Sequence, residues 1–300
     1  MKEEIPKITV LMATYNGVKF IDQQLTSLIA QTDVQIEIHV NDDGSTDGTL
    51  DRLNCWKQQG LIKTLTYSKN IGATRAFLKL LNESQSQGPI AFCDQDDIWV
   101  TDKLICQMNF LENDKPMLVF SKRQYIDSLD KPIGASKNLS FDPSFLNALV
   151  ENIVSGNSML LNQKAIELIR SYKDPQIKHY DSWIYLLVSA LGECRYIPDE
   201  LVKYRIHERN SVGLRKTSLK EFISSAKNFG QQATYFRKVV TVELPREFGV
   251  ELNRLISIFE NRSSLRKIVS VLKLRLRRQH FYDRLGFRII LLLGVIRKKF

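Results

Sequence analysis

The first 93 residues alternate between short apolar runs of strand length and longer runs with helical spacing. Strand-like runs lie at 7–13, 34–41, 61–67 and 89–93, and helix-like runs lie at 19–30, 48–59 and 72–84. This alternation is typical of a mostly parallel sheet, because parallel strands need a long crossover between them. The sequence therefore predicts an α/β fold with a mostly parallel sheet flanked by helices.

Three carboxylates in four residues follow the fourth strand-like run. Asp94, Asp96 and Asp97 come directly after the apolar run that ends at Cys93. Ligands of open α/β sheets bind at the carboxyl ends of strands. Carboxylates this close raise one another's pKa unless a counter-charge is present, and hard divalent cations prefer oxygen ligands. The pattern therefore indicates a cation site, with an acidic surface turn as the alternative.

Two further acidic positions stand at the ends of predicted elements. Asp42 and Asp43 follow the second strand-like run, in a loop where Gly44 permits a tight turn, and either carboxylate suits a nucleobase NH or a ribose hydroxyl. Asp181 lies in His179-Tyr180-Asp181-Ser182-Trp183, where an apolar helix is predicted to begin. We interpret Asp181 as a general base, with a helix cap as the alternative.

These motifs resemble those of family 2 glycosyltransferases over residues 5–215. The segment 8–17 (ITVLMATYNG) is similar to the family's opening strand and loop, 41–49 (NDDGSTDGT) to its first acidic motif, and 94–99 (DQDDIW) to its DxD metal motif. With the later Tyr204-Arg205-Ile206-His207, the chain resembles the rhamnosyltransferase-like branch. The segment 179–183 departs from that branch by one extra residue between His and Asp.

The resemblance implies a GT-A fold, a nucleotide-sugar donor and a Mn2+ or Mg2+ ion. It assigns nucleotide or donor binding to Thr14, Tyr15, Asp42, Asp43, Asp94 and Arg205, metal binding to Asp96, Asp94 and His207, catalysis to Asp181, and the acceptor or sugar lining to Trp99, Gly156, Asn157 and Trp183. Which of the three clustered aspartates ligates the metal stays open, and both tryptophans have a core position as the alternative. One base and direct displacement imply inversion at the anomeric carbon.

The branch resemblance favours dTDP-L-rhamnose as donor and a lipid-linked glycan hydroxyl as acceptor in bacterial cell-surface polysaccharide synthesis. A UDP-hexose-dependent enzyme of the same fold is the main alternative. A non-catalytic nucleotide-sugar-binding protein is an alternative of another class, because it needs no base at Asp181. A nucleotidyltransferase is disfavoured, since the loop 14–17 offers no basic residue to cradle phosphate.

The positive charge is concentrated at the end of the chain. Residues 261–300 contain 12 Lys and Arg against the single acid Asp283, a balance of +11, so the rest of this +10 chain sums to −1. The apolar run 285–296 is shorter than the roughly 20 residues that span a bilayer. A cationic apolar helix suits an anionic membrane face; packing on the domain or at a homo-oligomer interface is the alternative.

The remaining features set the expected organisation and compartment. We expect a catalytic domain at 1–215 and a helical basic extension at 216–300. The four cysteines form no CxxC pair, and the first six residues lack the apolar core of a secretory signal. These features predict a cytoplasmic protein, peripheral at the inner membrane face. Nucleic acid is not an expected partner, because the site is acidic and the tail lacks a known nucleic-acid motif.

Overall fold

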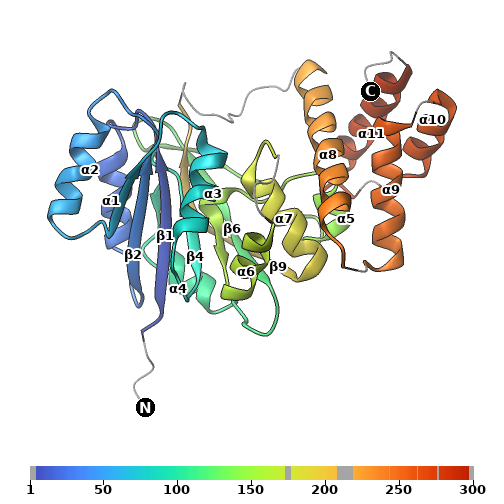
Figure 1. Cartoon of the computed structure of the whole chain (residues 1–300). Coiled ribbons are helices and arrows are strands. Elements are labelled where there is room, and N and C mark those ends of the chain that lie inside the picture. Colours follow the sequence, from blue (N-terminus) through green and yellow to red (C-terminus); the bar gives the residue numbers. More distant parts are fainter. Residues whose placement is uncertain are drawn as a thin grey trace. The chain divides into compact units, whose positions relative to one another are not determined.

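The computed structural model describes residues 5–172, 177–207, 219–242, 244–261, 263–275 and 277–296 (Figure 1). The chain divides into two compact units. The sheet unit contains the chain up to Asn138, Val154–Ser171 and the ninth strand, and the helical unit contains the later helices. The expected boundary at residue 215 lies outside the described residues. Two earlier segments, Leu139–Ile153 and Tyr172–Ala190, belong to the helical unit, which differs from the single boundary expected.

Within the described residues, the sheet unit has nine strands in the order β3-β2-β1-β4-β8-β6-β9-β5, with β7 paired to β6. The strands are β1 (Lys7–Thr14), β2 (Gln35–Asp42), β3 (Thr64–Tyr67), β4 (Ile90–Cys93), β5 (Ile98–Trp99), β6 (Met117–Ile126), β7 (Pro132–Ala135), β8 (Met159–Leu161) and β9 (Glu193–Arg205). Strands β3, β2, β1 and β4 are mutually parallel, and β8 runs antiparallel to both of its neighbours. The predicted α/β class and its first four strands are confirmed.

Helices alternate with the strands of the sheet unit along the chain, and the first three connect parallel strands. They are α1 (Ile21–Ile29), α2 (Thr49–Gln58), α3 (Ala73–Glu83), α4 (Lys103–Met108) and α6 (Gln163–Ser171). The three helices predicted before residue 93 are present, and each begins and ends within two residues of its expected bounds. Parallel pairing with these crossovers brings the carboxyl ends of β1, β2 and β4 to one edge of the sheet.

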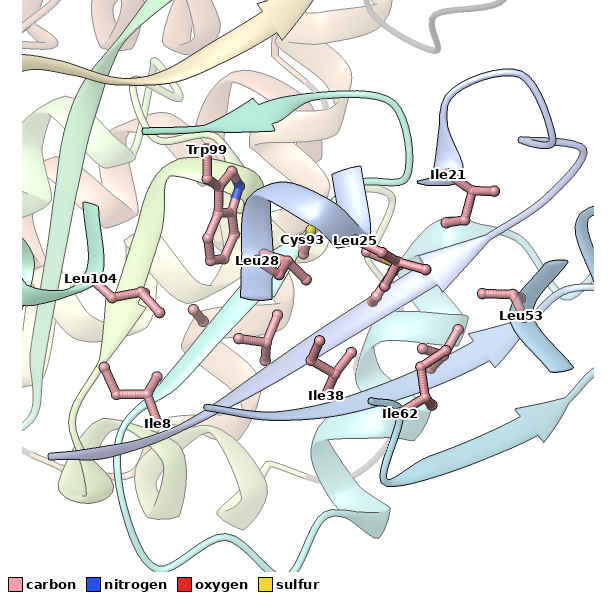
Figure 2. Close-up of a cluster of buried hydrophobic side chains, with 14 of the residues drawn as sticks. Ile8, Ile21, Leu25, Leu28, Ile38, Leu53, Ile62, Cys93, Trp99 and Leu104 are labelled. Atoms are coloured by element: carbon pink, nitrogen blue, oxygen red, sulfur yellow. The ribbon is translucent and has the colours of Figure 1, made fainter. Parts of the chain in front are cut away.

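The core follows the two-residue period of the strands. Every second residue of β1, from Ile8 to Met12, joins a buried cluster with Leu25 and Leu28 of α1 (Figure 2). Phe92 of β4 lies on the opposite face, where its ring meets that of Phe77 in α3 edge-on at 5.7 Å. The sheet is therefore covered on both faces, as its continuous apolar runs require.

The helical unit is held by aromatic side chains. Its helices are α5 (Phe145–Ala148), α7 (Tyr180–Leu191), α8 (Leu219–Val239), α9 (Arg246–Glu260), α10 (Ser264–Lys273) and α11 (Phe281–Ile296). Trp183 packs on Tyr235 at 5.3 Å, and Phe229 meets Phe287 at 6.4 Å. A Cβ at Gly230 would lie 2.4 Å from the Phe259 ring, so α8 and α9 approach closely there. No described helix is long and apolar enough to cross a membrane.

Candidate active site

The acidic segment after β4 places its carboxylates in two different environments. Asp94 and Asp96 are partly exposed, whereas Asp97 is fully buried. Asp97 Oδ1 accepts a hydrogen bond from the Arg205 backbone N–H at 3.0 Å, and Oδ2 accepts from Asn157 Nδ2. Burial, and then the charges of Asp96 and Asp94, raise the pKa of Asp97. Asp94 and Asp96 are therefore the two carboxylates open to a ligand, while Asp97 organises the loop.

The charge of Asp94 acts on two neighbouring buried groups. Burial raises the pKa of the Tyr204 hydroxyl and of the Cys93 thiol, and the Asp94 charge raises both further. His207 Nε2 lies 2.8 Å from Asp96 Oδ2. Among the described residues, no three or more His, Cys, Asp or Glu side chains group closely enough to hold a metal by themselves. Two carboxylates nonetheless fit Mg2+ or Mn2+ that shares its shell with substrate phosphates.

Arg205 is buried, and its guanidinium is bound to acceptors of the protein itself. Its side chain is 1% exposed, and its guanidinium donates to the Asp96 carbonyl at 2.8 Å, to Gln23 Oε1 at 2.7 Å and to the Asp130 carboxylate. The expected phosphate contact of Arg205 is corrected accordingly, because these protein acceptors occupy its donors. Sequence reasoning named Arg205 and missed Gln23 and Asp130, which carry no motif.

The loop after β1 is tied to the acidic segment by Gln95. The Gln95 amide accepts from the Tyr15 backbone N–H at 2.8 Å and donates to the Tyr15 carbonyl at 3.0 Å. Gly17 permits this, because a Cβ there would lie 2.2 Å from Gln95 Oε1. The Tyr15 side chain is 44% exposed. Tyr15 thus presents an open ring at the edge where a nucleobase is expected, and Gln95 is a positioning residue that the sequence analysis did not single out.

The acidic pair after β2 is turned inward. Asp42 is 1% exposed and accepts from Thr14 Oγ1 at 2.8 Å and from the N–H groups of Gly44 and Ser45 and the Ser45 hydroxyl, so its acceptor sites are filled. From the described residues, Asp43 accepts two side-chain hydrogen bonds, from the backbone N–H groups of Ile71 and Gly72 just before α3, at 2.8 and 2.7 Å. Of the two aspartates, Asp43 retains acceptor capacity for a ligand. The nucleotide role of this pair and of Thr14 stays a prediction.

The residues expected beside the sugar or acceptor lie in the interior. Trp99 is 2% exposed in the core of the sheet unit, and Trp183 is 0% exposed among the aromatic rings of the helical unit. The expectation that they wall a sugar site is corrected, and the core alternative holds, because neither ring has a solvent-facing side. Gly156 and Asn157 form a buried turn (Gly156–Ser158) whose amide holds Asp97. An acceptor role for that turn stays a prediction.

Asp181 lies in the first turn of α7, as predicted, and its carboxylate accepts from the Ser182 backbone N–H at 2.7 Å. Burial lowers the pKa of the neighbouring His179, and the Asp181 charge partly opposes that shift. Asp181 belongs to the helical unit, and the acidic segment belongs to the sheet unit. Its role as a base stays a prediction.

The amino-acid sequence is similar to one protein family and to several glycosyltransferases of known or assigned name. The family described as Glycosyl transferase family 2 matches residues 9–169. The chain is 30% identical to the putative teichuronic acid biosynthesis glycosyltransferase TuaG of Bacillus subtilis, over 70% of this chain and 83% of that protein. Shorter matches are with the dTDP-rhamnosyl transferase RfbG of Shigella flexneri (41% identical, 31% of this chain, 34% of RfbG) and with WfaP of Escherichia coli (35% identical, 38% of this chain, 45% of WfaP). WfaP is described as a UDP-Glc:alpha-D-GlcNAc-diphosphoundecaprenol beta-1,3-glucosyltransferase.

Solved structures share the fold. The structure of S. aureus TarS in complex with UDP-GlcNAc aligns with a TM-score of 0.63 over 97% of this chain and 92% of that one, at 15% identity. The mannosyltransferase PcManGT of Pyrobaculum calidifontis, in complex with GDP-Man and Mn2+, aligns with a TM-score of 0.60 over 99% of this chain and 89% of that one, at 14% identity. At these identities the alignments establish the fold alone.

Proposed function

The chain belongs to glycosyl transferase family 2, and from that membership we propose that it transfers L-rhamnose from dTDP-L-rhamnose to a hydroxyl of a glycan in bacterial cell-surface polysaccharide synthesis. The observation that carries the proposal is the shared edge of the sheet. There, Asp94 and Asp96 after β4 lie beside the exposed Tyr15 after β1. Parallel α/β sheets bind nucleotides at this edge.

Two relatives support different donors. RfbG is named a dTDP-rhamnosyl transferase and is 41% identical over 98 residues, whereas WfaP is named for UDP-Glc and is 35% identical over 116 residues. The combination of DQDDIW with the Tyr204–His207 segment favours rhamnose in our interpretation. A UDP-hexose donor is the second candidate, because WfaP matches a longer stretch of the chain.

The residues divide the chemistry between them. Asp94 and Asp96 would hold Mn2+ or Mg2+, which supplies charge stabilisation to a leaving nucleoside diphosphate when it is bound. Tyr15 would stack on the base, and Asp43 would accept from the nucleoside. Asp181 would remove the proton from the acceptor hydroxyl as that oxygen attacks the anomeric carbon. A single displacement of this kind inverts the anomeric configuration.

The acceptor side of the proposal rests on α10. Leu265, Val269 and Leu272, which we call the α10 stripe, lie at positions i, i+4 and i+7 of this helix and are 72%, 39% and 55% exposed. Arg266 and Lys273 are exposed and flank the stripe by helical spacing. An apolar stripe with a basic flank suits an anionic bilayer. We therefore propose peripheral attachment to the cytoplasmic membrane face, where a lipid-linked glycan would be met.

A ligand panel tests the donor. Thermal unfolding of the full chain is measured with dTDP-L-rhamnose, UDP-glucose, dTDP and UDP, each with Mn2+ and with EDTA. A ligand at a hundred times its Kd adds about 2.7 kcal/mol to the unfolding free energy. We expect the thymidine ligands to stabilise in the presence of Mn2+; a preference for the uridine ligands would remove the rhamnosyl proposal. Release of nucleoside diphosphate that depends on acceptor then separates an enzyme from a binding protein.

A further inference from the structure

Arg205 is a buried cation that ties together four separate parts of the chain. It ends β9 and is 1% exposed, a costly position for a guanidinium unless its donors are matched. Nε donates to the Asp96 carbonyl at 2.8 Å, and Nη1 donates to the Asp127 carbonyl at 3.2 Å and to Asp130. Nη2 donates to Gln23 of α1 at 2.7 Å. The side chain therefore links the acidic segment to α1 and to the turn between β6 and β7.

The partners of Arg205 also hold one another. Gln23 Nε2 donates to Asp130 Oδ2 at 2.7 Å, which closes a ring of three side chains. The Phe20 ring covers the guanidinium, with 4.5 Å between the ring centroid and the guanidinium carbon. The same ring lies 5.2 Å from the ring of His207. We call Arg205, Gln23, Asp130 and Phe20 the Arg205 bracket.

The end of β9 and the residues just after it make three contacts with the consecutive aspartates Asp96 and Asp97. The Arg205 side chain binds the main chain of Asp96, and the Arg205 backbone N–H binds the carboxylate of Asp97 at 3.0 Å. His207, two residues later, lies 2.8 Å from the carboxylate of Asp96. Asp96 is thus held at its main chain by the Arg205 side chain and at its carboxylate by His207.

We propose that Arg205 is a positioning residue that fixes Asp96 and His207 for a cation-bound nucleoside diphosphate. This inference rests on the proposed function. The planar guanidinium can donate to two carbonyls and two side chains at the same time, because its N–H groups point in several fixed directions. A lysine ammonium is a compact charge on one nitrogen and cannot reach all four acceptors. Loss of the bracket frees Asp96 to move, and groups that orient a metal ligand typically contribute 10–100-fold to metal affinity.

The test uses Arg205→Lys in the full chain and measures the binding of Mn2+ alone, and then of UDP and dTDP with Mn2+, by electron paramagnetic resonance and calorimetry. We expect the Kd for Mn2+ alone to rise by roughly tenfold or more, with no loss of secondary structure at the temperature of the measurement. A direct phosphate ligand would leave binding of Mn2+ alone unchanged, so that result would overturn the positioning role. Arg195→Lys is the matched control, because Arg195 lies on the same strand in surface ion pairs with Glu193 and Glu112.

A second variant keeps the test decisive if Arg205→Lys does not fold. Asp130 has a side chain that is 45% exposed, so Asp130→Asn removes one bracket charge at little risk to the core. We expect it to weaken Mn2+ binding several-fold, in the same direction as Arg205→Lys. If the wild type binds Mn2+ and nucleotide and Asp130→Asn binds them equally well, the Arg205 bracket does not position Asp96. The proposed function would still stand in that case. A wild type that binds neither overturns both.

Discussion

The three aspartates after β4 differ in what surrounds each carboxylate, and substitution by asparagine should separate them. We expect Asp96→Asn to lose cation-dependent nucleotide binding and turnover, because a neutral amide cannot replace the carboxylate as a ligand. We expect Asp97→Asn to keep nucleotide binding. Asn157 Oδ1 is buried without a hydrogen-bond partner among the described residues, so a turn of that amide would pair with an asparagine at 97.

Calorimetry with nucleotide and Mn2+, beside thermal unfolding, checks both variants. Burial already disfavours the charged form of Asp97 by raising its pKa, which is why a neutral replacement should be tolerated in the fold. Equal loss of binding in the two variants would show that the buried carboxylate acts on the ligand as well.

Lys103 gives a prediction about pH. It is fully buried beside the Trp99 ring, and burial lowers the pKa of its ammonium to about 7. Between pH 7 and its unfolded pKa near 10.4 the unfolded chain binds more protons than the folded one, so this group adds stability as pH rises. Lys103→Met removes that dependence. The stability of the variant minus that of wild type should therefore be greater at pH 6 than at pH 9, by roughly 2.7 kcal/mol.

Urea unfolding at the two pH values measures this difference. The slope with pH is the decisive quantity, because methionine also loses the hydrogen bond from Lys103 Nζ to Gln107 at 2.9 Å and the contact with the Trp99 ring. Lys57→Met, on an exposed position of α2, is the matched control. A flat response in both variants would mean that Lys103 keeps an ordinary titration in the fold.

At the scale of elements, the first turn of α7 carries the proposed base. Asp181 accepts from the Ser182 backbone N–H, a contact that asparagine at position 181 can retain through its carbonyl oxygen. Asp181→Asn should therefore keep donor binding and lose transfer by roughly 10²–10⁴-fold, the usual contribution of a general base. Single-turnover transfer measured beside donor affinity checks this. If donor affinity falls and the rate of bound substrate does not, Asp181 is a binding residue.

The α10 stripe gives a prediction for a helix face. Leu265→Ser combined with Leu272→Ser should reduce binding to vesicles of anionic lipid without lowering the unfolding temperature, because both side chains are already exposed. High salt should weaken the binding of the wild type, since exposed charges are screened. Flotation with anionic and with neutral vesicles measures both effects.

Leu129→Ser is the matched control for the stripe, because Leu129 is 73% exposed and lies in the sheet unit. It should leave vesicle binding unchanged. Sedimentation of the wild type and the double variant tests whether a second copy of the chain covers the stripe instead of a membrane. If the wild type is a dimer that does not bind vesicles, and the double variant is a monomer, the stripe is a subunit interface.

At the scale of the whole molecule, the basic tail is part of the fold. Gln279 donates from its backbone to Glu151 at 2.7 Å, and Arg278 Nη1 donates to the Val150 carbonyl. Phe287, Leu291 and Val295 of α11 are buried. Removing residues 264–300 should therefore unfold the helical unit, because each large apolar truncation costs about 2–5 kcal/mol against a total stability of about 5–15 kcal/mol.

Circular dichroism and thermal unfolding of the truncated chain check this expectation. A cooperative transition at the wild-type temperature would contradict it and would make residues 264–300 a separable extension. The double substitution in the α10 stripe is for this reason the cleaner way to examine membrane attachment, since it leaves the packing of α11 in place.

The sequence alone determined the order of strands and helices up to β4, and it placed Asp42, Asp94 and Asp181 at the ends of their elements. These features depend on local apolar spacing and on turn residues, which act within a few positions of one another. The same locality explains why the family motifs, which follow the strand ends, can be recognised from the order of the residues.

Only the tertiary structure decided which polar groups are buried and what they bind. Arg205 and Gln23 are 182 positions apart, and Asp130 carries no motif, so no local pattern announces their contact. The burial of Asp97, Trp99 and Trp183 also depends on neighbouring elements, as does the membership of Leu139–Ile153 in the helical unit. Desolvation and long-range pairing are properties of the packed chain, and they separate the aspartates that can meet a ligand from the one that supports them.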